Sequence, residues 1–371
     1  MSMDTASVGA RIADARERAG LTQAELATET GIARTALAKI ERGIRGVGAL
    51  EIASIARALS ARIEWFLTDP PAALVSYRLR EGDDMEVATI NTRLERLARD
   101  VESVQELEPS LVPTALEAQT PLRSIAEAER LAEHARQLCG LDGREPINDL
   151  IDVVGGLGLF AFSQELGADT ADAGTILLSR GAVSLVNSTG SVGRRRLSLA
   201  HELGHYLLAD DYTIDWRIAN RSSSDETEAR IDRFARAFLA PEAGLRTFWM
   251  STRGDHSIRD AAVQTASRFR IDMSTLARRL QDLGLADQSE CSEVRSAKTL
   301  QGDIVGFGLV VPHDLEGTTV PSRFGQAVLK LYRQKRLSTE RALSLLQGTL
   351  NAEDLPETNR SHEDEIWDLL T

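Results

Sequence analysis

Two histidines one helical turn apart, His201 and His205, lie inside an apolar run and constrain how the second half of this chain can fold. Side chains four residues apart in a helix project from the same face. The apolar residues of the run are Leu199, Ala200, Leu203, Leu207 and Leu208. The stretch therefore predicts a helix that is buried on one side and presents two imidazoles on another.

Two imidazoles at this spacing suit a Zn²⁺ ion, which proteins hold through nitrogen, sulfur and carboxylate ligands. Glu202 stands between them and is the expected general base, because zinc makes a water molecule acidic enough for a carboxylate to take its proton. The alternative is a pair of core histidines without a metal. Only six histidines occur in the chain, and two share this helix beside a glutamate, which favours the metal.

A catalytic zinc site needs a third protein ligand and one open position. We expect Glu228 to be that ligand, because spacings of three and four place it on one helix face with Ile231 and Ala235. Glu226 and Asp211 are the alternatives. Asp211 lies where some zinc peptidases place their third ligand, but the glycine that turns their chain is absent here.

Residues 1–70 have the pattern of an all-α bundle that contains a helix-turn-helix. Thr22 and Glu25 predict a capping box at the start of one helix. Gly31 suits the sharp turn at its end, because glycine tolerates positive φ. A second helix, from Arg34 to Arg42, follows this turn and can lie in the major groove of DNA.

The residues expected to contact DNA are polar groups of these two helices and of the loop that follows: Gln23, Arg34, Thr35, Lys39, Arg42 and Arg45. Arg42 and Arg45 are placed to contact phosphates. Residues 33–46 hold four basic and one acidic side chain, so this segment is positive within a chain of net charge -13. That net charge argues against nucleic-acid binding along the whole chain. A helical bundle with an ordinary charged surface is the alternative.

Residues 71–121 are predicted to be a helical connector. Its apolar positions alternate at spacings of four and three: Ile90, Leu94, Leu97, Val101 and Val104. This spacing indicates either a coiled-coil segment for dimerisation or a helix that packs on its own chain. The sequence alone leaves both interpretations open.

Residues 122–290 are expected to form a mainly helical domain with a small sheet. A helix is predicted at Ile125–Leu138, and short apolar segments predict strands at 157–162, 175–178 and 182–186. The last region, 291–371, is expected to be a small α/β unit that senses a signal or binds a partner. Its predicted elements are a strand at Ile304–Val311 and two helices within 324–347.

Residues 8–67 resemble the Xre/Cro-repressor family of helix-turn-helix domains. The resemblance rests on Gly20–Ala27, Gly31-Ile32 and Lys39–Gly43. It implies binding to a double-stranded DNA operator, with a homodimer on paired half-sites.

Residues 122–285 resemble the ImmA/IrrE family of metallopeptidases. The resemblance rests on Val186-Asn187, on Arg196–His205, and on Glu228 followed by Phe234-Ala235 and Leu239–Pro241. It implies a zincin-like domain with a gluzincin-like Zn²⁺ site of two histidines and one glutamate. The chain departs from the family pattern at four positions expected to serve packing: Ile231, Asp232, Phe238 and Ala240.

These patterns predict an α+β multidomain protein: a DNA-binding transcriptional regulator that carries a zinc endopeptidase. The resemblance implies cleavage of a repressor- or antitoxin-like partner in a stress, phage or toxin–antitoxin-like response; the chain's own 71–121 segment is a further possible substrate. The alternative is a transcription factor or antitoxin whose peptidase-like fold binds a partner or senses a signal without turnover. Two cysteines, no leader-like start and no long apolar run predict a cytoplasmic protein without membrane contact.

Overall fold

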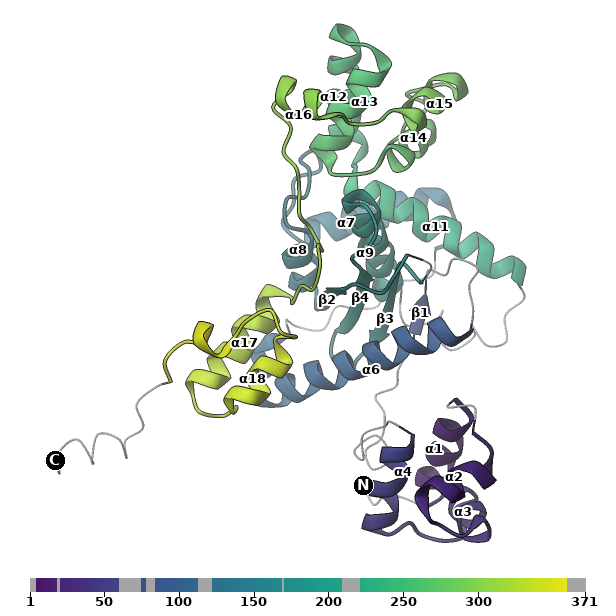
Figure 1. Cartoon of the computed structure of the whole chain (residues 1–371). Coiled ribbons are helices and arrows are strands. Elements are labelled where there is room, and N and C mark those ends of the chain that lie inside the picture. Colours follow the sequence, from purple (N-terminus) through teal and green to yellow (C-terminus); the bar gives the residue numbers. More distant parts are fainter. Residues whose placement is uncertain are drawn as a thin grey trace, which may run out of the picture. The chain divides into compact units, whose positions relative to one another are not determined.

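The computed structural model describes residues 5–18, 21–59, 75–77, 84–112, 122–168, 170–208 and 221–358. The chain divides into two compact units, residues 1–72 and 73–371, drawn in Figure 1. Asp211, one of the alternatives for the third metal ligand, lies outside the described residues. The finer domain limits at residues 121 and 290 stay a prediction.

The first unit is a bundle of short helices, as the helical spacing of its apolar residues predicts. Its described helices are α1 (Thr5–Arg18), α2 (Gln23–Thr30), α3 (Arg34–Glu41) and α4 (Ala49–Ala58). Their inward side chains form one core, in which Ile12, Leu26, Leu37 and Ile55 are fully buried.

The turn predicted between α2 and α3 is confirmed. The Thr22 hydroxyl accepts a hydrogen bond from the Glu25 amide at 3.3 Å, and the Glu25 carboxylate accepts one from the Thr22 amide at 2.7 Å. These two bonds complete the capping box. Gly31 ends α2 with a φ of 70°, a left-handed conformation that costs glycine little.

The described strands of the second unit form one sheet with the order β1-β3-β4-β2 (Figure 1). They are β1 (Val75–Tyr77), β2 (Leu159–Gln164), β3 (Ala173–Leu177) and β4 (Ala182–Asn187). β2 and β4 are parallel, whereas β3 is antiparallel to both β4 and β1. The three strands predicted within 157–186 are confirmed, and β1 is an addition that the sequence patterns did not indicate.

Helices pack on both faces of this sheet. The core on one face includes α7 (Ile125–Leu138), α8 (Leu150–Gly156), α9 (Val192–Leu207), α11 (Arg221–Leu239), α12 (Glu242–Asp255), α13 (Ile258–Phe269), α14 (Met273–Asp282) and α15 (Gln288–Ser296). The core on the other face includes α6 (Asp84–Leu107), the 3-10 turn Pro109–Leu111, α17 (Ser322–Arg333) and α18 (Thr339–Leu345). A second 3-10 turn, Ala352–Asp354, follows α18.

Burial on both faces follows from the alternation of side chains along each strand. In β2, Leu159 and Ala161 belong to the core that contains α9, whereas Phe160 and Phe162 belong to the core that contains α6. All four side chains are at most 1 % exposed. The sheet is thus the middle layer of three, and α9 is held on one face of it.

The apolar seam of α6 packs on its own chain. Its residues, Ile90, Leu94, Leu97, Val101 and Val104, are at most 2 % exposed. They share a core with Val183 and Leu185 of β4 and with Phe324 of α17. The intramolecular interpretation of the seam is therefore correct, and the coiled-coil dimerisation interpretation is wrong, because the sheet already covers these side chains.

The strand predicted at Ile304–Val311 is wrong, and so is the α/β character expected for the last region. Residues 301–306 form α16 (Gln301–Gly306), whose start is fixed by a 2.7 Å hydrogen bond from the Leu300 amide to the Asp303 carboxylate. Gly308 follows with a φ of 61°. Val305 and Val310 are 83 % and 66 % exposed, so no neighbouring strand covers this apolar run. The described part of the region is helical, with an isolated bridge between Thr319 and Ser163.

The α+β class of the whole chain is confirmed. No helix of the described residues could cross a membrane.

Candidate functional site

The helix that carries the histidine motif, α9, lies between the sheet and α11. Gly204 of α9 faces α11: a Cβ there would lie 2.8 Å from Ile231 Cγ2 and 3.0 Å from Phe234 Cδ1. The absence of a side chain at this position permits close packing of α9 on α11. This packing brings Glu228 of α11 within reach of the histidines.

Three candidate ligands converge where α9 and α11 meet. His201 Nε2 lies 3.0 Å from His205 Nε2 and 3.1 Å from Glu228 Oε2, and His205 Nε2 lies 3.6 Å from Glu228 Oε1. The ligand atoms all lie within 4.8 Å of one another. Two imidazole nitrogens and one carboxylate form one of the donor sets that hold zinc in catalytic sites. These residues therefore fit a zinc ion, as the sequence predicts.

Exposure differs between the two helices that supply the ligands. The His201 side chain is 2 % exposed and that of His205 is 8 % exposed, whereas the Glu228 side chain is 37 % exposed. The cluster is therefore closed on the α9 side and open to solvent beside Glu228. A metal held here keeps an accessible side for water or a substrate.

Asp232 contacts His201 at Nδ1, the ring nitrogen that does not belong to the ligand cluster. Its carboxylate lies 2.9 Å from His201 Nδ1. A carboxylate on the far ring nitrogen fixes the tautomer in which Nε2 offers its lone pair to a metal, and it makes that nitrogen more basic. Asp232 was expected to serve packing, and that interpretation is wrong. Its position four residues after Glu228, on the same helix face, is the signal that could have revealed this role.

The electrostatics of the cluster favour a positive charge. Burial alone would lower the pKa of His201, but hydrogen bonds with Asp232 and Glu228 and the charge of Glu202 outweigh it and raise the pKa to about 9. Burial likewise opposes ionisation of Glu228, yet its contacts with His201 and His205 hold its pKa far below the usual range. Without a metal, the cluster stabilises a protonated imidazole, and a divalent cation would supply positive charge at the same place.

Glu202 is fully buried beside the ligands. It lies on α9 next to His201, and its charge is one of the influences that raise the pKa of that histidine. The alternative ligand Glu226 is 72 % exposed and accepts a 2.6 Å hydrogen bond from Arg230. It forms a surface ion pair and takes no part in the cluster.

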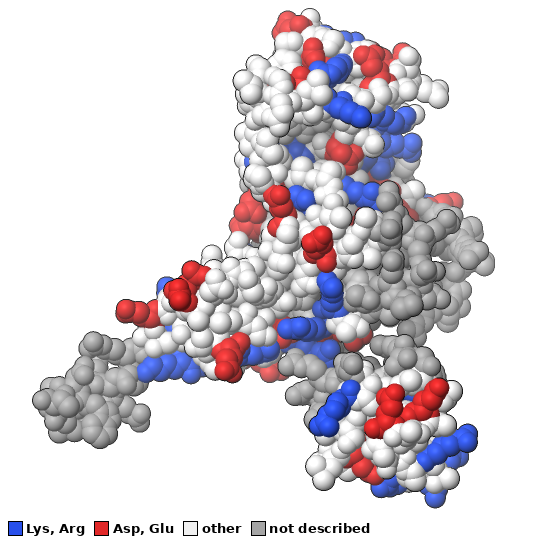
Figure 2. Space-filling view, in the orientation of Figure 1, with Lys and Arg blue, Asp and Glu red and all other residues white. Residues whose placement is uncertain are grey.

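The first unit presents most of the predicted DNA contacts to solvent. Arg34, Thr35 and Lys39 of α3 are exposed, and Arg42 and Arg45 are exposed directly after that helix. Figure 2 shows basic side chains at this unit's lower right, where Figure 1 labels α3. A helix with exposed polar groups after a tight turn is the geometry that enters a major groove.

Gln23 differs from the other predicted contacts, because its side chain is engaged inside the unit. Its amide donates a 2.6 Å hydrogen bond to Glu41, which is buried and pairs with Arg16 at 2.7 Å. This network ties α1, α2 and α3 together. Its half-buried position makes Gln23 part of the packing between the helices of the first unit.

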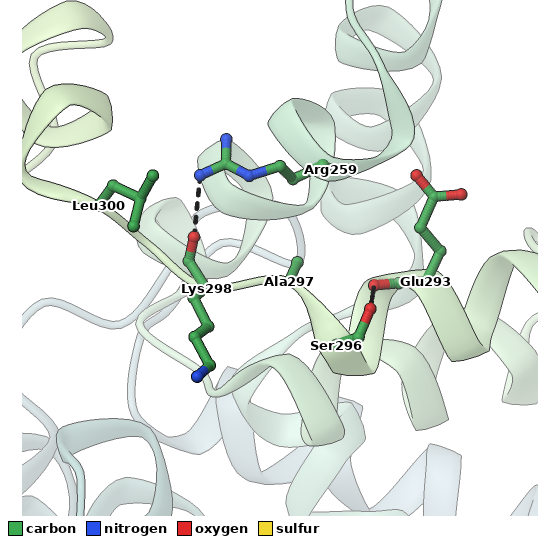
Figure 3. Close-up of a pocket in the computed structure, with 6 residues that line it drawn as sticks. All are labelled: Arg259, Glu293, Ser296, Ala297, Lys298 and Leu300. Carbon is green, nitrogen blue, oxygen red and sulfur yellow. Dashed lines mark hydrogen bonds between the residues drawn. The ribbon is translucent and has the colours of Figure 1, made fainter.

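A surface pocket lies further along the chain than α9 and α11, between α13 and the connection from α15 to α16 (Figure 3). Its lining residues are Arg259, Glu293, Ser296, Ala297, Lys298 and Leu300. The Arg259 guanidinium donates to the Lys298 carbonyl at 2.9 Å and pairs with Asp303 at 2.6 Å. The arginine thus joins α13 to the α15–α16 connection, and none of the predicted site residues lines this pocket.

The fold and the cluster define a metallopeptidase-like unit that follows a helix-turn-helix unit. Comparison with known families agrees: residues 170–281 match the IrrE N-terminal-like domain, and residues 12–66 match the helix-turn-helix family. The chain therefore combines an Xre-type helix-turn-helix domain with an IrrE N-terminal-like domain, which confirms both resemblances. No curated protein and no solved structure matched the chain.

Proposed function

We propose that this protein is a DNA-binding transcriptional regulator whose second unit is a zinc-dependent endopeptidase that cleaves a protein partner. The observation that carries the proposal is the cluster of His201, His205 and Glu228, with Asp232 behind it and the buried Glu202 beside it. A repressor- or antitoxin-like partner, cleaved in a stress, phage or toxin–antitoxin-like response, is the substrate class that we favour.

Each residue of the cluster has a distinct role in this proposal. Zn²⁺, when held by the two histidines and Glu228, supplies Lewis-acid polarisation of a peptide carbonyl and makes water acidic enough to lose a proton near neutral pH. Glu202 takes that proton and returns it to the departing amine. Asp232 keeps the His201 ring in one orientation and one tautomer.

The first prediction concerns Glu202. In a Glu202→Gln variant we expect zinc to stay bound and cleavage to fall by at least about a hundredfold, because an amide cannot accept the proton. The probe is a peptide library prepared from a bacterial proteome, in which new amino termini created by the zinc-loaded protein are identified by mass spectrometry. Glu226→Gln is the matched control, since that carboxylate lies on the surface.

Cleavage that survives in the Glu202→Gln variant would contradict the proposed mechanism. No cleavage by the zinc-loaded wild type, of either the library or its own chain, would favour a fold that binds a partner without turnover.

The second prediction concerns DNA binding through α3. We expect Lys39→Ala to weaken binding about tenfold and to reduce its salt dependence, because the exposed ammonium group of Lys39 would contact DNA. The probe is a duplex that the wild-type protein selects from a random-sequence library, and binding is measured by fluorescence anisotropy at several salt concentrations. Arg57→Ala, which removes an exposed basic side chain of α4, is the control. Equal losses in both variants would contradict the assignment of α3.

A further inference from the structure

The helix pair α17 and α18 carries a local excess of basic residues in a chain whose net charge is -13. Residues 317–339 contain five basic side chains and no acidic one: Arg323, Lys330, Arg333, Lys335 and Arg336. Three of the five lie within residues 333–336, where α17 ends and the turn to α18 begins. We call this segment the basic turn. Figure 2 shows basic side chains near the place where Figure 1 labels α17 and α18.

The cations of the basic turn are exposed to solvent. Two basic residues outside the turn have carboxylate partners, at 2.5 Å and 2.9 Å: Lys330 with Glu108, and Arg341 with Asp100. The Arg336 guanidinium instead donates to the Leu107 carbonyl, a neutral partner, at 2.8 Å. Within the part of the chain that the structure describes, no carboxylate pairs with Arg333 or Arg336. The turn therefore presents positive charge that acidic side chains leave available to a ligand.

The main chain of the basic turn holds Lys335 in a strained conformation. Its φ is 56°, in the left-handed region that disfavours residues with a Cβ. The Lys335 amide donates to the Tyr332 carbonyl at 2.9 Å, and the Arg336 amide donates to the Leu331 carbonyl at 3.0 Å. These two bonds form the helix ending that most often has glycine at the position of Lys335. A lysine there costs free energy that a glycine would save.

Lys335 also differs from the other non-glycine residues with positive φ. Within the described residues these are Arg270, Leu315 and Gln347, and none of the three is exposed, whereas Lys335 is. Arg270 pairs with Asp314 at 3.3 Å, and Leu315 is 1 % exposed in the core that contains α9. An exposed side chain gains little packing that could offset the strain. The positive charge at the surface is then the property that distinguishes this lysine from a glycine.

We propose that the basic turn binds the phosphate backbone of DNA, on duplex that flanks the site bound by the first unit. Exposed arginine and lysine side chains are the groups that contact phosphates in protein–DNA complexes. The proposal rests on DNA binding by the first unit, because a bound first unit keeps the second unit at a high local concentration of phosphate.

This contact uses a part of the second unit that the candidate metal site does not. α17 belongs to the core on one face of the sheet, whereas α9 and α11 belong to the core on the other face. Binding of DNA at the turn therefore requires neither zinc nor cleavage, and it can be measured without them.

The test compares the affinity of the full-length protein for two duplexes by fluorescence anisotropy. One is a duplex of about 20 base pairs that the wild type selects from a random-sequence library, and the other extends that site by about 20 base pairs on each side. Wild type should bind the longer duplex about tenfold more tightly. In an Arg333→Gln/Lys335→Gly variant this advantage should disappear, with unchanged affinity for the shorter duplex. The salt slope on the longer duplex should fall by about 2, since two cations are removed.

Two control variants separate the turn from charge and strain in general. Arg130→Gln/Lys298→Gln removes two exposed basic side chains elsewhere in the second unit and should keep the tenfold advantage. Gln347→Gly relieves a φ of 55° without changing charge and should also keep it. The Arg333→Gln/Lys335→Gly variant should melt at a temperature no lower than that of wild type, because glycine suits the left-handed conformation. A lower melting temperature together with weaker binding to both duplexes would show that the turn serves only the fold.

Equal affinity of wild type for the two duplexes would overturn the proposal, and so would an advantage that survives in the Arg333→Gln/Lys335→Gly variant. Either result would favour an acidic protein as the partner of the turn. Failure of DNA recognition by the first unit would be seen separately, as equal affinity of wild type for the selected duplex and for a scrambled duplex of the same length.

Discussion

At the scale of single residues, the candidate site depends on side chains that support the ligands as much as on the ligands. The histidine spacing predicted His201 and His205 because a four-residue step has one geometric meaning in a helix. The same argument from helical spacing predicted Glu228 as a ligand. It did not predict the role of Asp232, because a carboxylate near a helix surface is usually solvated. Only the observed contact with His201 distinguishes Asp232 from a solvated surface residue.

The third prediction belongs to this scale. Asp232→Ala should weaken zinc binding about 10- to 100-fold, because His201 loses the acceptor that orients its ring. The Asp232→Asn variant keeps an oxygen acceptor, so its zinc affinity should fall much less. Competition against a fluorescent chelator measures both affinities. Equal zinc affinity in wild type and the alanine variant would show that Asp232 does not position His201.

At the scale of elements, the sequence predicted where single helices begin and end, but it did not predict which elements pack against them. The bounds of α7 and the capping box of α2 matched the prediction, because caps and helical spacing are written in neighbouring residues. The seam of α6 has the same local pattern whether a second chain or a sheet covers it. The strand at 304–311 failed for the same reason: an apolar run is no strand unless another strand pairs with it.

An ion-pair network joins α7, α11 and α14, and α11 also carries Glu228 of the candidate site. Glu129 of α7 pairs with Arg279 of α14 and with Arg233 of α11, and Arg233 also pairs with Asp282 at 2.9 Å. Burial raises the pKa of Glu129, but hydrogen bonds from Arg279 and Arg233 outweigh it and hold the pKa below its ordinary value. Arg279 is fully buried, so it depends on this carboxylate for its countercharge.

The fourth prediction follows from that network. Glu129→Gln should lower the free energy of unfolding at neutral pH by about 3 kcal/mol, because it leaves the buried Arg279 charge without its partner. The pKa of Glu129 is lower in the folded state than in the unfolded state. The contribution of the Glu129 carboxylate to the free energy of unfolding is therefore complete above its pKa in the unfolded state, about 4.3. This contribution is lost as the pH falls through the lower pKa of the folded state.

Urea unfolding of wild type and variant across this pH range measures the effect. The difference between them should shrink below about pH 4. Glu133→Gln, which changes an exposed carboxylate of the same helix, is the control. A difference that stays constant down to the lowest pH would contradict the role of the Glu129 carboxylate.

At the scale of the whole molecule, the chain joins a helix-turn-helix unit to a metallopeptidase-like unit that holds a candidate metal site. The sequence patterns predicted both units, because each has short motifs with strict spacing. They did not predict that α6, β1 and the C-terminal helices complete the second unit, since those contacts join residues far apart in the chain. Long-range pairing of this kind has no local signal.

The most direct test of this account, and the fifth prediction, is the metal content of the purified full-length protein, measured by elemental analysis. We predict about one zinc per chain in wild type and in the Glu226→Gln control, and loss of that zinc in His205→Ala and in Glu228→Ala. Wild-type protein that contains no zinc and takes up none on titration would contradict the central claim that these three residues form a metal centre.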